Sequence, residues 1–269
     1  MIDVEKALMA KVPKAQSWPA WCRRLLSAGL KGLVHEREIN AFLERHRRAG
    51  GLEFIDAVLD QLNFGYSLSS RDRDNIPVAG RVVIVANHPL GALDGLALVR
   101  MVADVRPDVK IVANDLLMQL SPLAPLLLPV DNLSRRGFRK SLQGIVDALD
   151  DEQAVIVFPA GEVSRAGPKG VKDGNWLSGF LHAARRTNAP ILSVHVGGRN
   201  SSLFYSLASL YSPLGTLLLP HEMFRQKGRH ITLKVGGEIP LSRFDREDLA
   251  TVAKLKLLRK HVYRLGRER

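Results

Sequence analysis

A histidine and an aspartate that could act together as a general base lie in one turn of the chain. His88 and Asp94 stand in a segment rich in glycine and proline, directly after the apolar run Val83–Ala86. A β-strand that ends in such a turn places polar side chains at the carboxyl edge of a sheet, where open α/β folds hold their sites. An aspartate within hydrogen-bond reach would fix the tautomer of the imidazole and leave its other nitrogen free to take a proton. The alternative is structural, because a histidine before a proline is a common turn residue.

A second apolar run repeats this layout of strand, turn and polar residues. Ala154–Phe158 is followed by a turn that contains Gly161, Glu162, Ser164 and Arg165. Two such turns can face one cleft. Glu162 could bind a hydroxyl or an amine, and Arg165 could bind a carboxylate or a phosphate. The structural alternative is that Glu162 and Arg165 pair with each other across the loop.

The two segments together resemble the lysophospholipid (glycerolipid) acyltransferase superfamily. The signatures of that superfamily are Asn-His followed after four residues by Asp, and later Phe-Pro-Glu-Gly-Thr-Arg-Ser. In this chain five residues separate His88 from Asp94, and Ala160 and Val163 occupy the positions of the family's glutamate and arginine. The segment Asn-His-Pro-Leu-Gly-Ala-Leu-Asp-Gly is similar to the haemolysin-like branch, which includes acyltransferases of ornithine and glycine lipids. The similarity extends over nearly the whole chain, at Glu38–Asn40, Phe54–Asp56, Trp176, Gly179–Phe180, Ala189–Ile191 and Gly197–Asn200.

The resemblance implies transfer of a fatty acyl group from acyl-carrier protein or acyl-CoA to the hydroxyl of a lysolipid. The acceptor would be lysophosphatidate or a lyso-amino-acid lipid such as lyso-ornithine lipid, and the altered second signature fits the latter. His88 would act as general base and Asp94 would orient it. We expect direct transfer without an acyl-enzyme, because the chain has no Gly-x-Ser-x-Gly segment and Cys22 is remote in sequence from both turns. The reaction requires no metal and no bound cofactor.

By position, the resemblance also implies a set of substrate-binding residues. Asn87, Gly161, Glu162, Ser164 and Arg165 would line the acceptor pocket, and backbone amides of the Gly161 turn or of the Pro89–Gly91 turn would stabilise the oxyanion. Three further arginines follow the apolar run Leu126–Val130 and could face a phosphate or the acyl donor. They are Arg135, Arg136 and Arg139, and a solvated helix start is the alternative for at least two of them.

The charge of the chain favours an anionic partner. The formal net charge is +12 and the isoelectric point is about 10.1, so the protein is drawn to membranes or nucleic acids. Nucleic-acid binding is the less favoured prediction, because there is no Cys/His finger and only 6% of the residues are aromatic. Basic clusters favour an anionic membrane surface by about 1 kcal/mol per Lys or Arg. A lipid-binding protein with an inactive site is the other alternative.

The cysteine and histidine content of the chain indicates its cellular compartment and limits the metal sites that it can form. Cys22 is the single cysteine, which excludes an internal disulfide, and the eight histidines lack metal-ligand spacing. The start of the chain does not resemble a secretory signal. We therefore expect a cytoplasmic protein that docks peripherally on the inner face of the cytoplasmic membrane. Neither apolar stretch, Leu117–Val130 or Leu203–Pro220, is typical of a membrane span.

The periodicity of the chain predicts an α/β fold with a helical extension. Residues 1–65 are expected to be helical and could dock on a membrane through Trp18 and Trp21, or cap the catalytic core. Residues 66–269 are expected to form the α/β acyltransferase domain. Its central sheet should be mostly parallel but mixed, flanked by helices on both faces, as the resemblance to glycerol-3-phosphate acyltransferases also implies. The expected strands are Arg81–Ala86, Val109–Ala113, Leu126–Val130, Ala154–Phe158, Pro190–Val196 and His230–Val235, and the expected helices between them are Asp94–Val105, Arg136–Leu149 and Trp176–Thr187.

Overall fold

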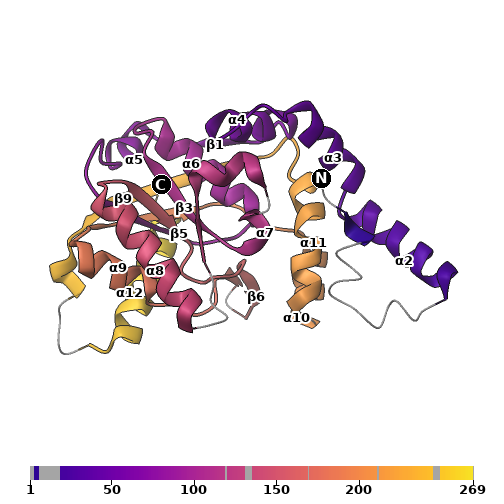
Figure 1. Ribbon diagram of the computed structural model, residues 1–269. Coiled ribbons are helices and arrows are strands. Elements are labelled where there is room, and N and C mark those ends of the chain that lie inside the picture. Colours follow the sequence, from indigo (N-terminus) through magenta and orange to yellow (C-terminus); the bar gives the residue numbers. More distant parts are fainter. Residues whose placement is uncertain are drawn as a thin grey trace.

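A seven-stranded mixed sheet forms the centre of the protein in the computed structural model (Figure 1). The structure describes residues 3–5, 19–118, 120–130, 135–168, 170–210, 212–244 and 249–268, without the side chains of residues 23, 115, 116, 135–139 and 212–214. The strand order is β1-β9-β8-β2-β5-β3-β4. The strands are β1 (Gly65–Ser67), β2 (Val82–Ala86), β3 (Val109–Ala113), β4 (Leu127–Pro129), β5 (Ala154–Val157), β8 (Ile191–Val196) and β9 (His230–Ile239).

The sheet is parallel from β8 to β4 and becomes antiparallel at one place. Strands β8, β2, β5, β3 and β4 pair in parallel, β9 pairs antiparallel with β8, and β1 pairs in parallel with β9. All six predicted strands are confirmed. The predictions missed β1 and a separate hairpin of β6 (Arg165–Gly167) and β7 (Gly170–Lys172), since three-residue strands show no period.

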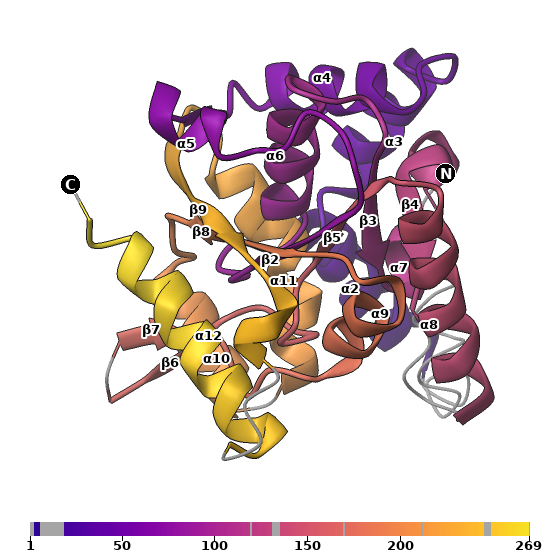
Figure 2. The ribbon, with the colours of Figure 1, turned by 90° about the vertical axis from the view of Figure 1, so that its left-hand side faces the viewer.

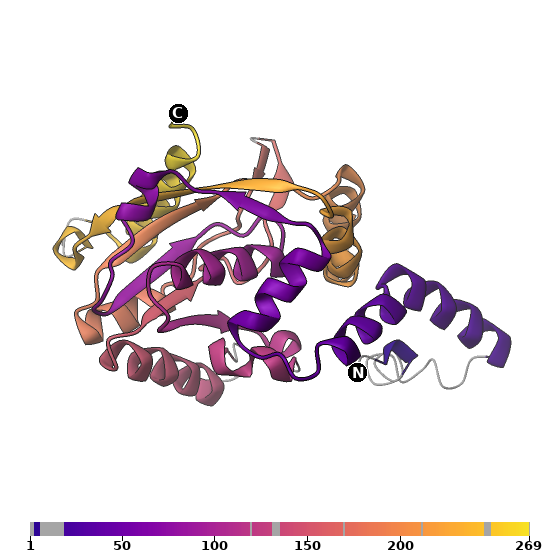
Figure 3. The same ribbon diagram turned by 90° about the horizontal axis from the view of Figure 1, so that it is seen from above.

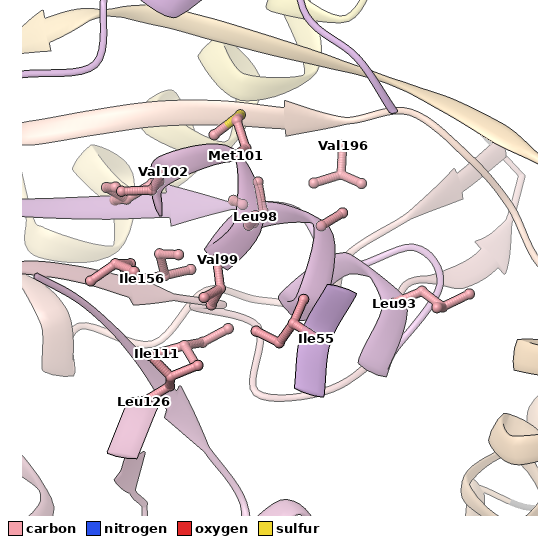
Figure 4. Packing of buried hydrophobic residues seen from close by; sticks show 14 of the residues in the cluster. Ile55, Leu93, Leu98, Val99, Met101, Val102, Ile111, Leu126, Ile156 and Val196 are labelled. Carbon is pink, nitrogen blue, oxygen red and sulfur yellow. The ribbon is translucent and has the colours of Figure 1, made fainter. Parts of the chain in front are cut away.

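Helices cover both faces of the sheet, as predicted. Alternate residues of β2 point to opposite faces, so Ile84 packs with one cluster and Val83 with the other. The first cluster lies under α4 (Leu52–Gln61) and α6 (Ala92–Ala103), and its packing of Ile55, Leu98 and Ile156 is seen in Figure 4. Figure 2 shows the three helices that cover the second cluster, which are α8 (Arg135–Asp150), α9 (Gly179–Thr187) and α12 (Thr251–Leu265). Helix α9 begins three residues later than predicted, because Trp176 lies in the preceding loop.

The helices before β1 are not alike in their packing. Helix α2 (Ala20–Leu33) projects from the α/β body, as Figure 3 shows. Helix α3 (Glu36–Arg45) buries Phe42 in the main core, and helix α4 buries Phe54, Ile55 and Leu59 there. The predicted helical character is confirmed for residues 20–61, and the domain boundary at residue 65 stays a prediction. On α2, Trp21 is 70% exposed, and Trp18 lies outside the described residues.

The two apolar stretches considered above fold as short elements. Leu117–Val130 contains the end of α7 (Asp115–Met118), the 3-10 helix η2 (Ser121–Leu126) and β4. Leu203–Pro220 falls within α10 (Ser202–Leu210) and α11 (Ser212–Arg225), which form a hairpin beside the sheet. In the part of the chain that the structure describes, no helix has the length and apolarity needed to cross a bilayer. The remaining short elements are α5 (Ser70–Asp74) and the 3-10 helix η3 (Leu241–Phe244).

A buried arginine ties together the amino-terminal ends of the strands. Arg106 is 2% exposed, and its guanidinium donates to both carboxylate oxygens of Asp108 at 2.7 Å. It also donates to the carbonyl oxygens of Gly80 at 2.6 Å and of Glu152 at 2.7 Å. These carbonyls precede β2 and β5, so one side chain joins the loops that lead into two central strands. The same contact holds the pKa of Asp108 below its ordinary value.

Replacing Arg106 with methionine should destabilise the protein by about 2–4 kcal/mol, because buried carbonyl groups would lose their donors. The measurement is urea unfolding monitored by circular dichroism. Arg71→Met is the matched control, because Arg71 is exposed. Equal free energies of unfolding for the two variants would show that Arg106 has no such role.

Candidate active site

His88 and Asp94 meet in the structure. The Nδ1 atom of His88 lies 3.1 Å from Oδ2 of Asp94. His88 follows β2, and Asp94 is the third residue of α6. The turn between them closes at Gly91, the N-cap of α6, whose φ of 87° favours glycine. The additional residue between His88 and Asp94 is therefore accommodated by a glycine turn, and the predicted pair is formed.

Asp94 is held as a buried acceptor. Its side chain is 0% exposed, and Oδ2 also accepts from the backbone amides of Leu90 at 2.8 Å and Gly91 at 3.2 Å. Its other oxygen, Oδ1, has no hydrogen-bond partner among the described residues. Burial raises the pKa of the Asp94 carboxyl, and the hydrogen bonds from His88, Leu90 and Gly91 oppose that rise. The carboxylate faces the first turn of a helix, where the helix dipole favours negative charge.

The imidazole of His88 is fixed on its second side by an aromatic ring. It stacks on Phe158 with ring centroids 3.9 Å apart and an angle of 21° between the planes. Its side chain is 17% exposed. Since Nδ1 faces Asp94 and Nε2 has no partner in the described part of the chain, Nε2 is the ring nitrogen that can take a proton from another molecule.

The two predicted turns lie against each other. The backbone amide of Ser164 donates to the carbonyl oxygen of His88 at 2.8 Å. Phe158, which stacks on His88, directly follows β5, and Gly161 closes the second turn with a φ of 67°. The two turns are therefore in contact, and substrate binding by Ser164 stays a prediction.

A buried aspartate outside both predicted turns holds them together. Asp173, 5% exposed, accepts at Oδ1 from the backbone amide of His88 at 3.1 Å and from Oγ of Ser164 at 2.5 Å. Its Oδ2 accepts from Nε1 of Trp176 at 2.9 Å, and its backbone amide donates to the hydroxyl of Tyr263 at 2.7 Å. Asp173 therefore links the β2 turn, the β5 turn and α12. An isolated Asp-Gly pair in the sequence predicts only a turn, so this role was missed.

The side chain of Asn87 bonds to the backbone of a neighbouring strand. It is 2% exposed and bonds in both directions to the backbone of Val196, with Nδ2 donating at 2.8 Å and Oδ1 accepting at 2.7 Å. The amide joins the ends of β2 and β8, and contact of Asn87 with substrate stays a prediction. Asn200 has a similar role, because its Nδ2 donates to the carbonyl oxygen of Pro89 at 3.2 Å.

The remaining predicted residues divide into three groups. Glu162 and Arg165 pair with each other across the loop, which is the structural alternative given above. Nη2 of Arg165 lies 2.5 Å from Oε2 of Glu162. The side chains of Arg135, Arg136 and Arg139, at the start of α8, lie outside the described residues. Three of the amides considered for the oxyanion already have acceptors, since that of Gly161 donates to Phe158 and those of Leu90 and Gly91 donate to Asp94. Within the described ranges, no group of three His, Cys, Asp or Glu side chains could hold a metal ion.

The chain is similar in sequence to known acyltransferases. The sequence model of a family described as "Acyltransferase" matches residues 7–267. A lyso-glycine lipid O-acyltransferase of Bacteroides thetaiotaomicron is 33% identical over 254 residues, which cover 91% of each chain. One of Phocaeicola vulgatus is 32% identical over 255 residues, which cover 91% of this chain and 88% of that protein. Among solved structures, the 1-acyl-sn-glycerophosphate (LPA) acyltransferase PlsC from Thermotoga maritima gives a TM-score of 0.49 at 18% identity, covering 90% of this chain and 95% of that chain.

The geometry predicts the tautomer of His88. Neutral His88 should carry its proton on Nδ1, facing Asp94, and Asp94→Leu should remove this preference, because the proton on Nδ1 would lose its acceptor. Nitrogen NMR of the imidazole measures this directly, with His88→Gln to assign the signal. An Nε2–H tautomer in the wild-type protein would contradict the hydrogen bond between His88 and Asp94.

Proposed function

The chain belongs to the acyltransferase family whose sequence model spans residues 7–267, and we propose that it transfers a fatty acyl group from a thioester to the hydroxyl of a lysolipid. The observation that carries this proposal is the pairing of Nδ1 of His88 with the buried carboxylate of Asp94. The pairing leaves Nε2 of His88 as the base for an acceptor hydroxyl.

The proposed reaction has two steps and no covalent enzyme intermediate. In the first, Nε2 of His88 removes the proton of the acceptor hydroxyl while the oxygen attacks the thioester carbonyl and forms a tetrahedral oxyanion. In the second, the carbon–sulfur bond breaks, and the imidazolium returns its proton to the leaving thiolate. The products are the ester and the free thiol. Asp94 stabilises the imidazolium that exists between the two steps.

Direct transfer is supported by the surroundings of Ser164 and Cys22, the two side chains considered as nucleophiles. The Oγ atom of Ser164 is buried and donates to Asp173 at 2.5 Å, so this hydroxyl is engaged. Cys22 lies on α2, which projects from the α/β body. An acyl-enzyme would need a nucleophile activated by a neighbouring base. His88, the base of the site, is instead oriented toward an external acceptor.

We propose a lyso-amino-acid lipid as the acceptor and place lyso-glycine lipid first. Support comes from the two relatives named lyso-glycine lipid O-acyltransferase, each aligned over nine tenths of this chain. Lyso-ornithine lipid and lysophosphatidate are the other acceptors to be compared. The donor would be acyl-carrier protein or acyl-CoA, and the reaction requires neither a metal nor a bound cofactor.

A peripheral position on the inner face of the cytoplasmic membrane would bring the enzyme to such an acceptor. The net charge of +12 favours an anionic membrane surface. Trp21 and Leu25, each 70% exposed on the projecting helix α2, would provide the apolar contact. Several basic residues and two apolar side chains together are sufficient for reversible docking.

The proposal is tested by transfer of a labelled acyl group to lyso-glycine lipid, lyso-ornithine lipid and lysophosphatidate, from acyl-carrier protein and from acyl-CoA. His88→Ala should lower the rate by about 10²–10⁴-fold, the range expected for a lost general base. His182→Ala is the matched control, because His182 is an exposed imidazole on α9. Labelling of lyso-glycine lipid at the same rate by wild type and His88→Ala would overturn the mechanism. Absence of labelling by the wild type would overturn the function.

A further inference from the structure

A cavity of about 270 Å³ adjoins the His88 turn, and it has no role in the reaction described above. Resting on the proposed function, we propose that this cavity binds the headgroup carboxylate of the acceptor lipid through Lys172 and Arg267. It is walled by residues of β7, β8 and α12 and by the turn after β2, and the lining includes Asn87, Ser164 and His195. The volume exceeds the roughly 30 Å³ share of one water molecule several times, so it can hold a small polar headgroup.

The lining of the cavity is cationic. Lys172 and Arg267 both contribute to it, and no Asp or Glu belongs to the lining. Neither cation forms an ion pair with a described carboxylate, so their charges are not neutralised within the part of the chain that is described. Lys172 is half-buried, with Nζ 5.7 Å from the centre of the Tyr263 ring. A half-buried cation beside an open cavity favours an anionic ligand.

The other titratable groups of the cavity favour their neutral forms. His195 lines the wall, and burial lowers the pKa of its imidazole. Burial also raises the pKa of the Tyr263 hydroxyl. The charge of the lining therefore comes from one lysine and one arginine. Their two positive charges are sufficient for the carboxylate of the acceptor that we propose.

The wall at the end of α12 requires a residue without a side chain. A Cβ atom at Gly266 would lie 2.3–2.5 Å from ring atoms of His195. Glycine at this position lets the chain pass directly over the imidazole and brings the next residue, Arg267, to the cavity. The close approach of two elements thus forms this wall of the cavity.

The position of the cavity fits a ligand that is also presented to His88. Asn87 and Pro89, the residues on either side of His88, line the cavity, and Ser164 lines it and donates to the carbonyl of His88. The imidazole itself is not part of the lining and faces Asp94. A bound anion would therefore not contact the imidazole, and the accepting hydroxyl has to belong to another part of the same ligand. In a lysolipid, the headgroup anion and the accepting hydroxyl are separated in this way.

Arg165 is less suited to this role than Lys172, although the two residues are register partners in the β6–β7 hairpin. The guanidinium of Arg165 is already paired with Glu162. A carboxylate ligand would have to displace that internal carboxylate, whereas Lys172 has no such competitor among the described residues. We therefore propose Lys172, and not Arg165, as the residue that binds the carboxylate.

The test is binding, measured by calorimetry on the full chain, of N-octanoylglycine, its uncharged carboxamide and octyl phosphate. Wild type should bind the carboxylate about tenfold more tightly than the carboxamide, and Lys172→Met and Arg267→Met should each remove most of that preference. Lys260→Gln is the matched control, because it removes an exposed charge from α12 outside the cavity and should keep the preference.

Equal affinity of the wild type for the carboxylate and the carboxamide would overturn the proposal. A loss of preference in Lys260→Gln equal to that in Lys172→Met would overturn it too, since it would indicate general charge attraction. Tighter binding of octyl phosphate would contradict the carboxylate assignment. Because binding does not require acyl transfer, a preserved carboxylate preference in a protein without transferase activity would refute the proposed function and not the cavity.

Discussion

The geometry of the site depends on the buried carboxylate of Asp94. A single oxygen accepts from the imidazole of His88 and from the backbone amides of Leu90 and Gly91. The general base, the turn and the start of α6 are therefore fixed by one atom. A buried carboxylate that lost its donors would cost several kcal/mol, so the turn and the helix start are constrained to keep this arrangement. The catalytic group is positioned by the same contact that closes the turn.

A second buried carboxylate, that of Asp173, performs the same task between elements. It joins the His88 turn to Ser164, and its backbone amide joins both to Tyr263 on α12. The turn after β5 therefore contributes backbone contacts and a stacking ring, from Phe158, to the base. Its exposed ion pair of Glu162 and Arg165 adds little rigidity, because surface ion pairs contribute at most about 1 kcal/mol. The rigid parts of the site are the buried ones.

The sequence allowed the sheet and the catalytic pair to be predicted, for a physical reason. The central strands are buried on both faces, so they appear as continuous apolar runs, and the turns after β2 and β5 must lie at one edge of a parallel sheet. Residues that act through long-range contacts could not be found in this way. Asp173 bonds to His88 across 85 positions, and Asn87 bonds to Val196 across 109. Such pairings depend on tertiary structure, which the local sequence around these residues does not show.

The central claim is that His88 and Asp94 act as one unit in acyl transfer, and a double-mutant cycle tests it most directly. The rates to compare are those of wild type, His88→Ala, Asp94→Asn and the double variant with the same acceptor and donor. Residues that act as a unit are strongly non-additive. We predict that Asp94→Asn lowers the rate by about 10²-fold or more in the wild-type background and by less than about threefold once His88 is absent. Equal factors in both backgrounds would contradict the account.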